Sequence, residues 1–436
     1  MTIQNNISQI LSEASHPITS DADLTYLMDA IGDSKYVLLG EASHGTHEYY
    51  TWRAKISQRL IEEKGFNFIA VEGDWPNCYQ LNRYIKNYAN AKPNAYEALL
   101  NFKRWPTWMW ANWEIVAFSE WLKSYNMDKP MKNRIGFFGL DIYSLWESLE
   151  VIIDYLKTKD LATLKTALKA IRCFEPYKAD DGQSYAKANA IVPELCTDEV
   201  VKLLWELRRK MPQYDGDIEN AFNIEQNALI SVNAEKYYRA MLSGGSLAWN
   251  IRDWHMNNTL DRLMKLHGKN AKCIVWEHNT HIGDARATNM TDEGMINLGQ
   301  LINEEHLNEG VFALGFGSYK GSVIAGRKWS DVMRKQIVPP AINNSWEYYL
   351  HNAGNTNNRL ILLDKIKDEN FKKTPLEHRA IGVVYNPEYE QYGNYVPSIL
   401  TTRYNAFFFI DETSALHPLH ITPDGHQLPE TFPFGI

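Results

Sequence analysis

The chain has 436 residues, of which 44% are hydrophobic and 22% charged, and its formal net charge is -8. This is the composition of a globular protein, and it excludes collagen-like and low-complexity architectures. Because phosphate binding needs clustered Lys and Arg, the acidic balance argues against a nucleic acid as the main partner.

Repeated β-α units are predicted, since short apolar runs end abruptly in polar residues and helical patterns follow many of them. The first run, residues 36–40, leads into Glu41 and His44, and a helix over 47–64 follows it, closed by Gly65 as its C-terminal cap. The other predicted strands are 66–71, 134–140, 272–276, 311–316, 359–363, 380–385 and 406–410. Buried strands that alternate with helices predict an α/β fold with a mostly parallel sheet flanked by helices.

Amphipathic helical patterns replace the strands between about residues 145 and 265, and the first of these helices is expected to start at Ser144. We interpret this stretch as a helical insertion or lid over the cleft. The predicted division is therefore an α/β catalytic core over 1–145 and 266–436, with the insertion over 146–265. The sequence shows no Pro-, Gly- and Ser-rich linker between these parts.

Polar side chains follow directly after four of the predicted strands. In open α/β sheets the ligand lies in the crevice outside the carboxyl ends of the strands, so we expect these side chains to meet at one edge of the sheet. The residues concerned are Glu41 with His44, Glu72, Asp141, and Glu277 with His278 and His281.

The first motif, G-E-A-S-H-G at 40–45, favours an activated imidazole. Flanking glycines permit a sharp turn, and a carboxylate at Glu41 is placed to orient His44 as a general base for water. The alternative is a histidine that only satisfies loop hydrogen bonds. Ser43 suggests the nucleophile elbow of serine esterases, but that motif requires Gly where Glu41 stands, so a serine nucleophile is the weaker hypothesis.

The second motif, W-E-H-N-T-H at 276–281, places His278 and His281 three residues apart after a strand. Such a pair serves as metal ligands or donates hydrogen bonds to a developing oxyanion. The zinc-protease signature H-E-x-x-H is absent from this motif. A purely structural role for one of the two histidines also remains open.

Glu72 stands between a predicted strand and a helix that has Pro76 in its first turn. An acidic residue there either caps the helix or works in the site. Asp74 is the better capping candidate, which leaves Glu72 as a second catalytic carboxylate or a metal ligand.

Two arginines are candidates for charge stabilisation. Arg53 lies one turn after two tyrosines on the helix that follows the first motif, and from there it can reach back to the site. Its alternative is an ordinary exposed helix arginine. Arg252 is a candidate substrate-binding residue on a predicted helix, and a buried ion pair with Asp253 is its alternative.

Tryptophan is unusually frequent, with 14 residues. Most of these rings are expected in the core, but four of them lie close together at Trp105, Trp108, Trp110 and Trp113. We predict that Trp105, Trp108 and Trp110 line an apolar cleft that binds the substrate.

The four cysteines form no C-x-x-C pair, which fits a reducing compartment. The first residues lack the features of a signal peptide, and no apolar run approaches the ~20 residues that span a bilayer. These patterns predict a cytoplasmic protein without a membrane partner.

Five motifs in order, LLGEASHGTHEYY, FIAVEGDWP, RIGFFGLDIYSLW, NIRDWHMNNTL and IVWEHNTHIGD, resemble the erythromycin esterase family over nearly the whole length. The resemblance implies an α/β protein with helices over an active-site cleft, which hydrolyses a macrolide lactone ester with an activated water. It implies His44 as the general base beside Glu41. Arg53, Glu72, His278 and His281 also match positions of the family's functional set.

The leading hypothesis is a carboxylic-ester hydrolase that needs no metal and no cofactor and acts on a small-molecule ester. In it, His44 activates water, Glu41 and Glu72 orient base and water, and the oxyanion is stabilised by a set of three cationic or hydrogen-bonding residues, Arg53, His278 and His281. One rival is a metal-dependent hydrolase that uses Glu41, Glu72 and the histidines as ligands. The other rival is a protein that binds a hydrophobic small molecule without turnover. The oligomeric state is not predicted.

Overall fold

The computed structural model describes residues 3–180, 182–191, 195–214, 217–242, 244–354 and 358–420. Within these residues a nine-stranded sheet has the order β1-β8-β11-β6-β2-β5-β3-β4, and β7 pairs with β6. Its strands are β1 (Ser15–Pro17), β2 (Tyr36–Leu39), β3 (Phe68–Asp74), β4 (Gly136–Asp141), β5 (Cys273–Trp276), β6 (Val311–Ala325), β7 (Arg334–Val338), β8 (Asn358–Leu362) and β11 (Ala406–Thr413). A two-stranded sheet contains β9 (Leu376–Arg379) and β10 (Tyr395–Ser398).

The centre of the large sheet is parallel, as the sequence predicts. The pairs β2–β5, β2–β6, β3–β5, β3–β4 and β6–β11 are all parallel, whereas β1, β7 and β8 join the sheet through antiparallel pairs. Every residue of β2, β4 and β5 is buried. Continuous apolar runs form these strands because both faces of a parallel sheet are covered.

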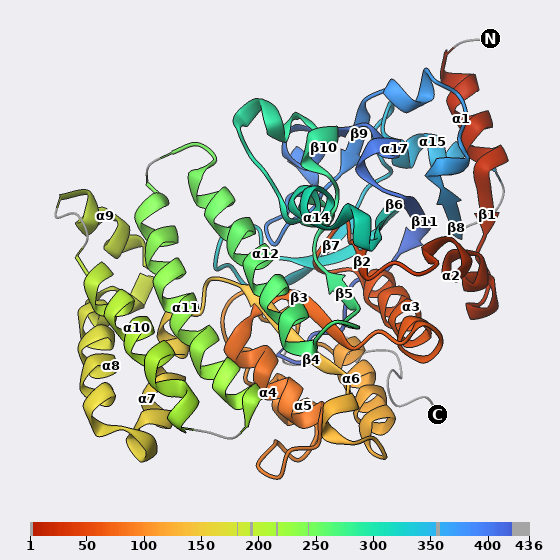
Figure 1. Ribbon diagram of the computed structural model, residues 1–436. Coiled ribbons are helices and arrows are strands. Elements are labelled where there is room, and N and C mark those ends of the chain that lie inside the picture. Colours follow the sequence, from red (N-terminus) through yellow and green to blue (C-terminus); the bar gives the residue numbers. More distant parts are fainter. Residues whose placement is uncertain are drawn as a thin grey trace, which may run out of the picture.

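Helices cover both faces of the sheet (Figure 1). Helices that contribute to the core on one face are α2 (Thr25–Ile31), α3 (His47–Lys64), α5 (Ala95–Leu99) and α6 (Trp113–Asn126). Helices that contribute on the other face are α1 (Ile3–Ala14), α12 (Leu247–His267), α14 (Leu298–His306), α15 (Trp346–Asn352) and α17 (Leu400–Arg403). Alternate residues of the central strands enter the two cores, and α4 (Trp75–Ile85) contributes to both.

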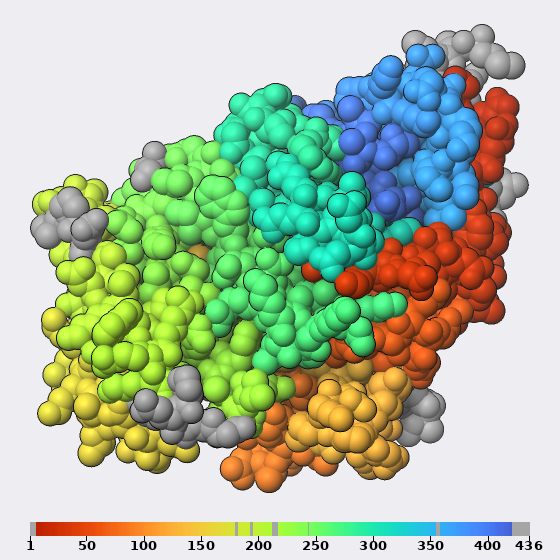
Figure 2. Space-filling model, viewed as in Figure 1, coloured from red at the N-terminus to blue at the C-terminus, as the bar shows by residue number. Residues whose placement is uncertain are grey.

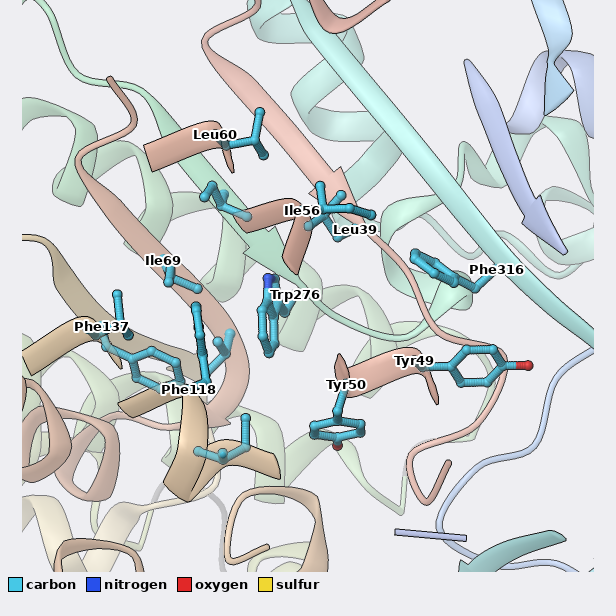
Figure 3. Close-up of a cluster of buried hydrophobic side chains, with 14 of the residues drawn as sticks. Leu39, Tyr49, Tyr50, Ile56, Leu60, Ile69, Phe118, Phe137, Trp276 and Phe316 are labelled. Atoms are coloured by element: carbon cyan, nitrogen blue, oxygen red, sulfur yellow. The ribbon is translucent and has the colours of Figure 1, made fainter. Parts of the chain in front are cut away.

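Aromatic rings join α3 and α6 to the sheet on the first face (Figure 3). Phe118 of α6 stacks on Trp276 at the end of β5, with ring centroids 5.1 Å apart. The indole N–H of Trp276 donates to the Ser57 hydroxyl of α3 at 3.0 Å. These contacts hold the middle of α3 against the carboxyl end of β5. Helix α3 ends at Gly65, which is in the left-handed conformation as predicted.

Residues 145–240 form a helical region with a core of its own. It contains α7 (Leu145–Lys159), α8 (Leu161–Phe174), α9 (Gln183–Ile191), α10 (Thr197–Tyr214) and α11 (Ile218–Ala240). Figure 2 shows this region as the yellow to yellow-green surface at one end of the molecule. A disulfide between Cys173 and Cys196 crosses it, a pairing that the sequence analysis does not predict. The two remaining α-helices of the described residues, α13 (Asn279–Ile282) and α16 (Glu390–Gly393), are single turns elsewhere in the molecule, and short 3-10 turns make up the other elements.

The prediction of a strand at 380–385 is wrong. Ile381 bridges Ser43 and Val384 bridges Gly326, so residues of this segment pair singly with two different segments and no ladder forms. The strands on either side of it, β9 and β10, pair with each other instead. Short strands β1 and β7 were also not predicted, because a few residues at a sheet edge carry little periodic signal.

No helix among the described residues is both long and apolar enough to cross a membrane. The division of the chain into a core and a 146–265 insertion stays a prediction.

Candidate functional site

The candidate site lies where four neighbouring strands end, in the sheet order β2-β5-β3-β4. Residues that follow these strands line one cavity of about 400 Å3. Their side chains are His44 after β2, Glu72 and Asp74 at the end of β3, Asp141 at the end of β4, and His278 with His281 after β5. The structure therefore brings together most of the polar residues that the sequence places after strands.

The loop that carries His44 is packed too closely for any residue but glycine at its two ends. A Cβ at Gly40 would lie 2.1 Å from the Asn279 side-chain oxygen, and a Cβ at Gly45 would lie 1.9 Å from the Ile324 carbonyl oxygen. The loop is further held by Ile381, whose N–H donates to the Ala42 carbonyl at 2.8 Å. Close packing on both sides fixes the direction of the His44 ring.

A buried chain of charged groups holds His44. The ring Nδ1 lies 2.9 Å from Oε1 of Glu41, and Oε2 of Glu41 accepts a hydrogen bond from Arg53 at 2.5 Å. The Arg53 guanidinium lies between the rings of Tyr50 and Trp276, 4.5 and 4.8 Å from their centroids. Glu41 and Arg53 are buried and do not line the cavity. Glu41 therefore contacts the His44 ring at the nitrogen away from the cavity, and Arg53 holds Glu41 in place.

The other nitrogen of His44 faces the cavity. Its Nε2 lies 4.0 Å from Oε1 of Glu72. Burial favours the neutral ring, but the carboxylates of Glu72 and Glu41 outweigh burial and raise the pKa of His44 above its usual value.

Glu72 is held as a carboxylate. Its Oε2 accepts the backbone N–H of His278 at 2.9 Å, and its Oε1 accepts a hydrogen bond from Arg252 at 2.7 Å. Burial alone would favour the neutral acid, but the positive charge around it, that of Arg252 included, and the backbone N–H of His278 lower the pKa of Glu72 well below its usual value. The indole N–H of Trp110 donates to the Glu72 carbonyl at 2.9 Å, which fixes the backbone as well.

Arg252 of α12 joins the helical part of the chain to the strand ends. Its Nε and Nη2 donate to the two oxygens of Asp141 at 2.9 and 2.7 Å, and its Nη1 lies 2.9 Å from Nε2 of His281. It does not pair with Asp253, which was the alternative from the sequence. The guanidinium thus sits among Glu72, Asp141 and His281.

The tautomer of His281 follows from its neighbours. Arginine only donates, so Nε2 of His281 accepts from Arg252, and Nδ1 carries the proton and donates to Asp253 at 2.9 Å. The ring stacks on Trp249, with centroids 4.6 Å apart. Both nitrogens are therefore engaged within the protein.

His278 has the opposite tautomer. The backbone N–H of Thr280 donates to its Nδ1 at 3.3 Å, and the Thr280 hydroxyl lies 2.8 Å from the same nitrogen. Burial and the neighbouring His44 lower the pKa of His278 well below its usual value, so the ring is neutral and its proton is on Nε2. This N–H makes no hydrogen bond of good geometry among the described residues, although the Ala42 carbonyl is near enough to the ring to act on its pKa. It is a donor available to a ligand in the cavity.

Aromatic side chains form much of the remaining wall. Trp105 and Trp110 line the cavity as predicted, but Trp108 is fully buried and does not. The other aromatic residues that line it are Phe102, Tyr143, Trp249 and Trp329. The three tryptophans lie close together in sequence, but the turn at 107–109 directs Trp108 into the core.

Two more residues of the sequence motifs, Ser43 and Glu277, lie away from the cavity, and Asp74 lines it without the capping role expected of it. Ser43 is buried and its hydroxyl bonds that of Thr46, so the geometry gives no support to a serine nucleophile. Glu277, which precedes His278 in the sequence, is fully buried. Burial and the neighbouring Glu72 raise its pKa well above the usual value. Asp74 does not cap α4 with its side chain, because it forms an ion pair with Arg104 at 2.9 Å.

Sequence reasoning missed several residues of the site. Thr280 orients His278, and Asp253 orients His281. The spacing of Trp249 and Arg252, three apart on a helix, was a usable signal that both face the same side. No signal in the sequence indicated which face that is.

Fold and site together define a class: an α/β protein whose parallel strands end in a cavity lined by histidines, carboxylates and aromatic rings. Residues 61–413 match the erythromycin esterase family, and the chain belongs to this family. It is 25% identical to erythromycin esterase type II of Escherichia coli over 332 residues, which cover 71% of this chain and 75% of the relative. It is 20% identical to the putative hydrolase YbfO of Bacillus subtilis over 425 residues, which cover 93% of this chain and 87% of the relative. These names indicate a hydrolase of the esterase class.

Solved structures confirm the fold. A protein from Bacillus cereus has a TM-score of 0.80 at 20% identity, with 96% of this chain and 100% of that chain covered. A succinoglycan biosynthesis protein has a TM-score of 0.77 at 22% identity, with 96% and 99% covered. A mutant of the erythromycin esterase EreC in its open conformation has a TM-score of 0.67 at 16% identity, with 95% and 98% covered.

Proposed function

We propose that this chain hydrolyses a carboxylic ester or lactone with a water activated by His44. The observation that carries the proposal is the 4.0 Å separation of Nε2 of His44 from Oε1 of Glu72 at the cavity wall. A water about 2.8 Å from each atom fits between them. In that position Glu72 accepts one of its protons in a hydrogen bond and His44 removes the other.

Glu41 and Arg53 orient the proposed base, His44. Glu41 accepts a hydrogen bond from Nδ1–H of His44, which leaves the lone pair of Nε2 toward the water, and the carboxylate stabilises the imidazolium that forms. Arg53 fixes Glu41 and does not reach the cavity, so we assign it a positioning role in place of the oxyanion role that the sequence suggested.

His278 is the proposed oxyanion donor. The rings of His278 and His44 are neighbours, with centroids 4.9 Å apart, and the Nε2–H of His278 makes no hydrogen bond of good geometry to another described residue. Attack of the water on the ester carbonyl carbon gives a tetrahedral oxyanion that accepts this hydrogen bond. When the carbon–oxygen bond to the leaving group breaks, the proton on His44 passes to the departing alkoxide. Products are the carboxylic acid and the alcohol.

His281 takes a different part from the one expected. Both of its nitrogens are engaged, so we propose that His281 and Arg252 hold Glu72 in place while Asp141 holds Arg252. The guanidinium also supplies positive charge at the cavity wall, where a substrate carbonyl or hydroxyl is able to bind.

We favour a reaction without a metal. The Arg252 guanidinium occupies the centre of the carboxylates and imidazole that would otherwise be ligands for a divalent cation. Among the described residues, the groups with metal-binding geometry lie outside this site. The rival, a metal-dependent hydrolase, predicts loss of turnover with a chelator and its return with added metal.

The proposed substrate is a large apolar ester of the macrolide type. Support comes from the aromatic walls, and from the relative in Escherichia coli that is named an erythromycin esterase. A volume of about 400 Å3 lies at the small end of the usual range for ligand pockets, so a macrolide would extend past Trp105 and Trp329 toward solvent.

The test is hydrolysis of 14-membered macrolides and simple aryl esters by the native chain and by His44→Ala, each with and without chelator. Loss of general-base catalysis costs about 100- to 10,000-fold in rate, so His44→Ala should show almost no turnover while its circular dichroism is unchanged. His351→Ala, which removes a histidine paired with Asp411 outside the cavity, is the matched control and should keep full activity. Retained activity in His44→Ala would refute the mechanism. Tight binding without turnover in both proteins would favour the binding-protein rival.

A further inference from the structure

Three groups with metal-ligand chemistry meet outside the candidate active site, at His47, Glu114 and His417. Nδ1 of His47 lies 2.6 Å and Nδ1 of His417 lies 2.7 Å from the same oxygen, Oε1 of Glu114. All three ligand atoms lie within 4.8 Å of one another. The cluster takes no part in the mechanism above, since none of the three residues lines the cavity.

Backbone contacts bring the three residues together. His47 is the first residue of α3, and its N–H donates to the Ser414 carbonyl at 2.9 Å. Glu114 is in the first turn of α6, where the N–H of Trp113 donates to the His417 carbonyl at 3.0 Å. The chain segment after β11 thus lies across the N-termini of both helices. These main-chain hydrogen bonds, and not only the side-chain contacts, keep the three residues close together.

The carboxylate of Glu114 is poorly satisfied for a buried group. Its side chain is 1% exposed, and its second oxygen is buried without a hydrogen-bond partner among the described residues. Both imidazole contacts fall on the same oxygen, so one side of the carboxylate is engaged and the other is not. An ionised carboxylate out of water needs more than one engaged oxygen to offset its desolvation.

From this geometry we propose that His47, Glu114 and His417 bind a zinc ion as a structural site. Two imidazoles and a carboxylate are ligands that Zn2+ prefers, and a tetrahedral ion with bonds of about 2.1 Å sets its ligand atoms roughly 3.4 Å apart. When the ion binds, the distance from each imidazole nitrogen to the Glu114 oxygen therefore grows by less than about 1 Å, and the Nδ1 protons pass to solvent. The imidazole side chains of His47 and His417 are 25% and 27% exposed, which leaves an open side for water as the fourth ligand.

A zinc ion at this site would link the segment after β11, through His417, to the start of α3, through His47. His47 stands three residues after His44, so the ion would hold the far end of that loop. Metal binding stabilises the folded chain because the unfolded chain lacks the assembled ligands. The site acts on stability and leaves the water-activation chemistry to His44.

The test measures Zn2+ binding and the thermal midpoint of the full-length chain after metal is removed with a chelator and the chelator is dialysed away. We expect one Zn2+ per chain by metal analysis and a higher midpoint with Zn2+ but not with Mg2+. In His417→Gln and Glu114→Gln, Zn2+ affinity should fall by more than about tenfold, because even losing a group that only orients a ligand costs about 10- to 100-fold. Co2+ in the native chain should give the visible absorption of a tetrahedral site.

His306→Gln is the matched control, because His306 belongs to a more exposed group with Asp261 and Glu305. It should bind Zn2+ like the native chain. Zn2+ binding that is lost in His306→Gln and kept in His417→Gln would overturn the assignment, as would a native chain that binds no Zn2+. A variant that fails to fold without metal is recognised by circular dichroism, and His47→Gln then replaces it in the comparison. Failure of this proposal leaves the His44-dependent hydrolysis assay untouched.

Discussion

His44 and His278 are neighbouring imidazoles in opposite protonation environments. Burial lowers the pKa of His44, but the carboxylates of Glu72 and Glu41 outweigh it and raise this pKa. Burial and His44 itself lower the pKa of His278. Two groups of one chemical type are thereby separated into a base and a neutral hydrogen-bond donor. Environments that push the pKa values of paired groups apart are typical of acid–base sites.

Replacement of Glu72 by Gln tests this arrangement through pH. A general base works when it is deprotonated, so the rate should fall as the pH drops through the raised pKa of His44. Glu72→Gln removes a carboxylate that raises this pKa and leaves the opposing charge of Arg252. The acid limb of kcat/KM should therefore move to lower pH, and kcat should fall because the water is less well oriented. Glu412→Gln, which breaks a surface ion pair with Lys320, should leave the profile unchanged. An unmoved acid limb in Glu72→Gln would contradict the role of His44.

Glu277 predicts a pH-dependent stability. Burial and Glu72 raise its pKa well above the usual value, and both carboxyl oxygens lack partners among the described residues. In the folded chain Glu277 keeps its proton at pH values where the unfolded chain has lost it. The unfolded chain then binds fewer protons, so the free energy of unfolding falls as pH rises from the ordinary glutamate pKa toward the raised one.

Glu277→Gln should therefore stabilise the chain increasingly with pH, by at most about 1.4 kcal/mol per pH unit in this window, because Gln does not titrate. Thermal unfolding of both proteins at about pH 5 and about pH 8 measures the difference. A difference that is equal at the two pH values would mean that Glu277 is ionised in the folded chain.

At the scale of elements, the start of α6 shows how one side chain shapes both a helix and the cavity. Oδ1 of Asn112 accepts the N–H of Ile115 at 2.9 Å, and its Nδ2 donates to the carbonyls of Trp108 and Met109 at 2.8 and 3.1 Å. The same residue therefore caps the helix and holds the turn that leads to Trp110. Every polar atom of this buried amide is used, so its loss leaves unpaired groups.

Asn112→Ala should lower the free energy of unfolding by about 2 kcal/mol or more, since a helix cap and two buried hydrogen bonds are lost. Asn94→Ala is the matched control, because Asn94 caps α5 with one hydrogen bond to Glu97 at an exposed position. It should cost about 1 kcal/mol. Urea unfolding measures both, and equal losses would show that the buried hydrogen bonds of Asn112 contribute nothing beyond the cap.

At the scale of the whole molecule, the helical region 145–240 is packed around its own core, whereas the sheet has a core on each face. None of the residues that line the cavity comes from α7 to α11, and α12 is the helix that carries Trp249 and Arg252 to it. The Cys173–Cys196 disulfide closes a stretch of 23 residues within the helical region. Its effects should therefore stay local.

Replacement of both Cys173 and Cys196 by Ala should lower the stability of the helical region by about 3 kcal/mol, the loop-closure entropy of a chain segment of this length. Faster hydrogen exchange is expected in α8 and α10, with exchange in the sheet and ester turnover unchanged. Cys78→Ala, at a free buried cysteine in the core of the sheet, is the control and should not affect the helical region. Faster exchange throughout the chain would mean that the two parts unfold as one.

Much of the fold was predictable because its signals are local. A continuous apolar run identified β2 and β5, and Gly65 marked the end of α3, since each pattern depends on residues adjacent in sequence. The run at 380–385 looked the same but found no partner strand, because Ile381 and Val384 bridge two different segments. Strand pairing is a property of distant residues, and the sequence of one segment does not contain it.

For the candidate site, the sequence by itself determined which polar residues follow the strands, and thus that Glu41, His44, Glu72 and His278 would meet at one sheet edge. Only the tertiary structure decided what each faces. Arg252 contacts Glu72 across 180 positions of sequence, and its hydrogen bond to His281 sets the tautomer of that ring. The physical reason is that local patterns show where a strand ends and which residues follow it. The direction of a hydrogen bond and the protonation of a group depend instead on neighbours that packing supplies.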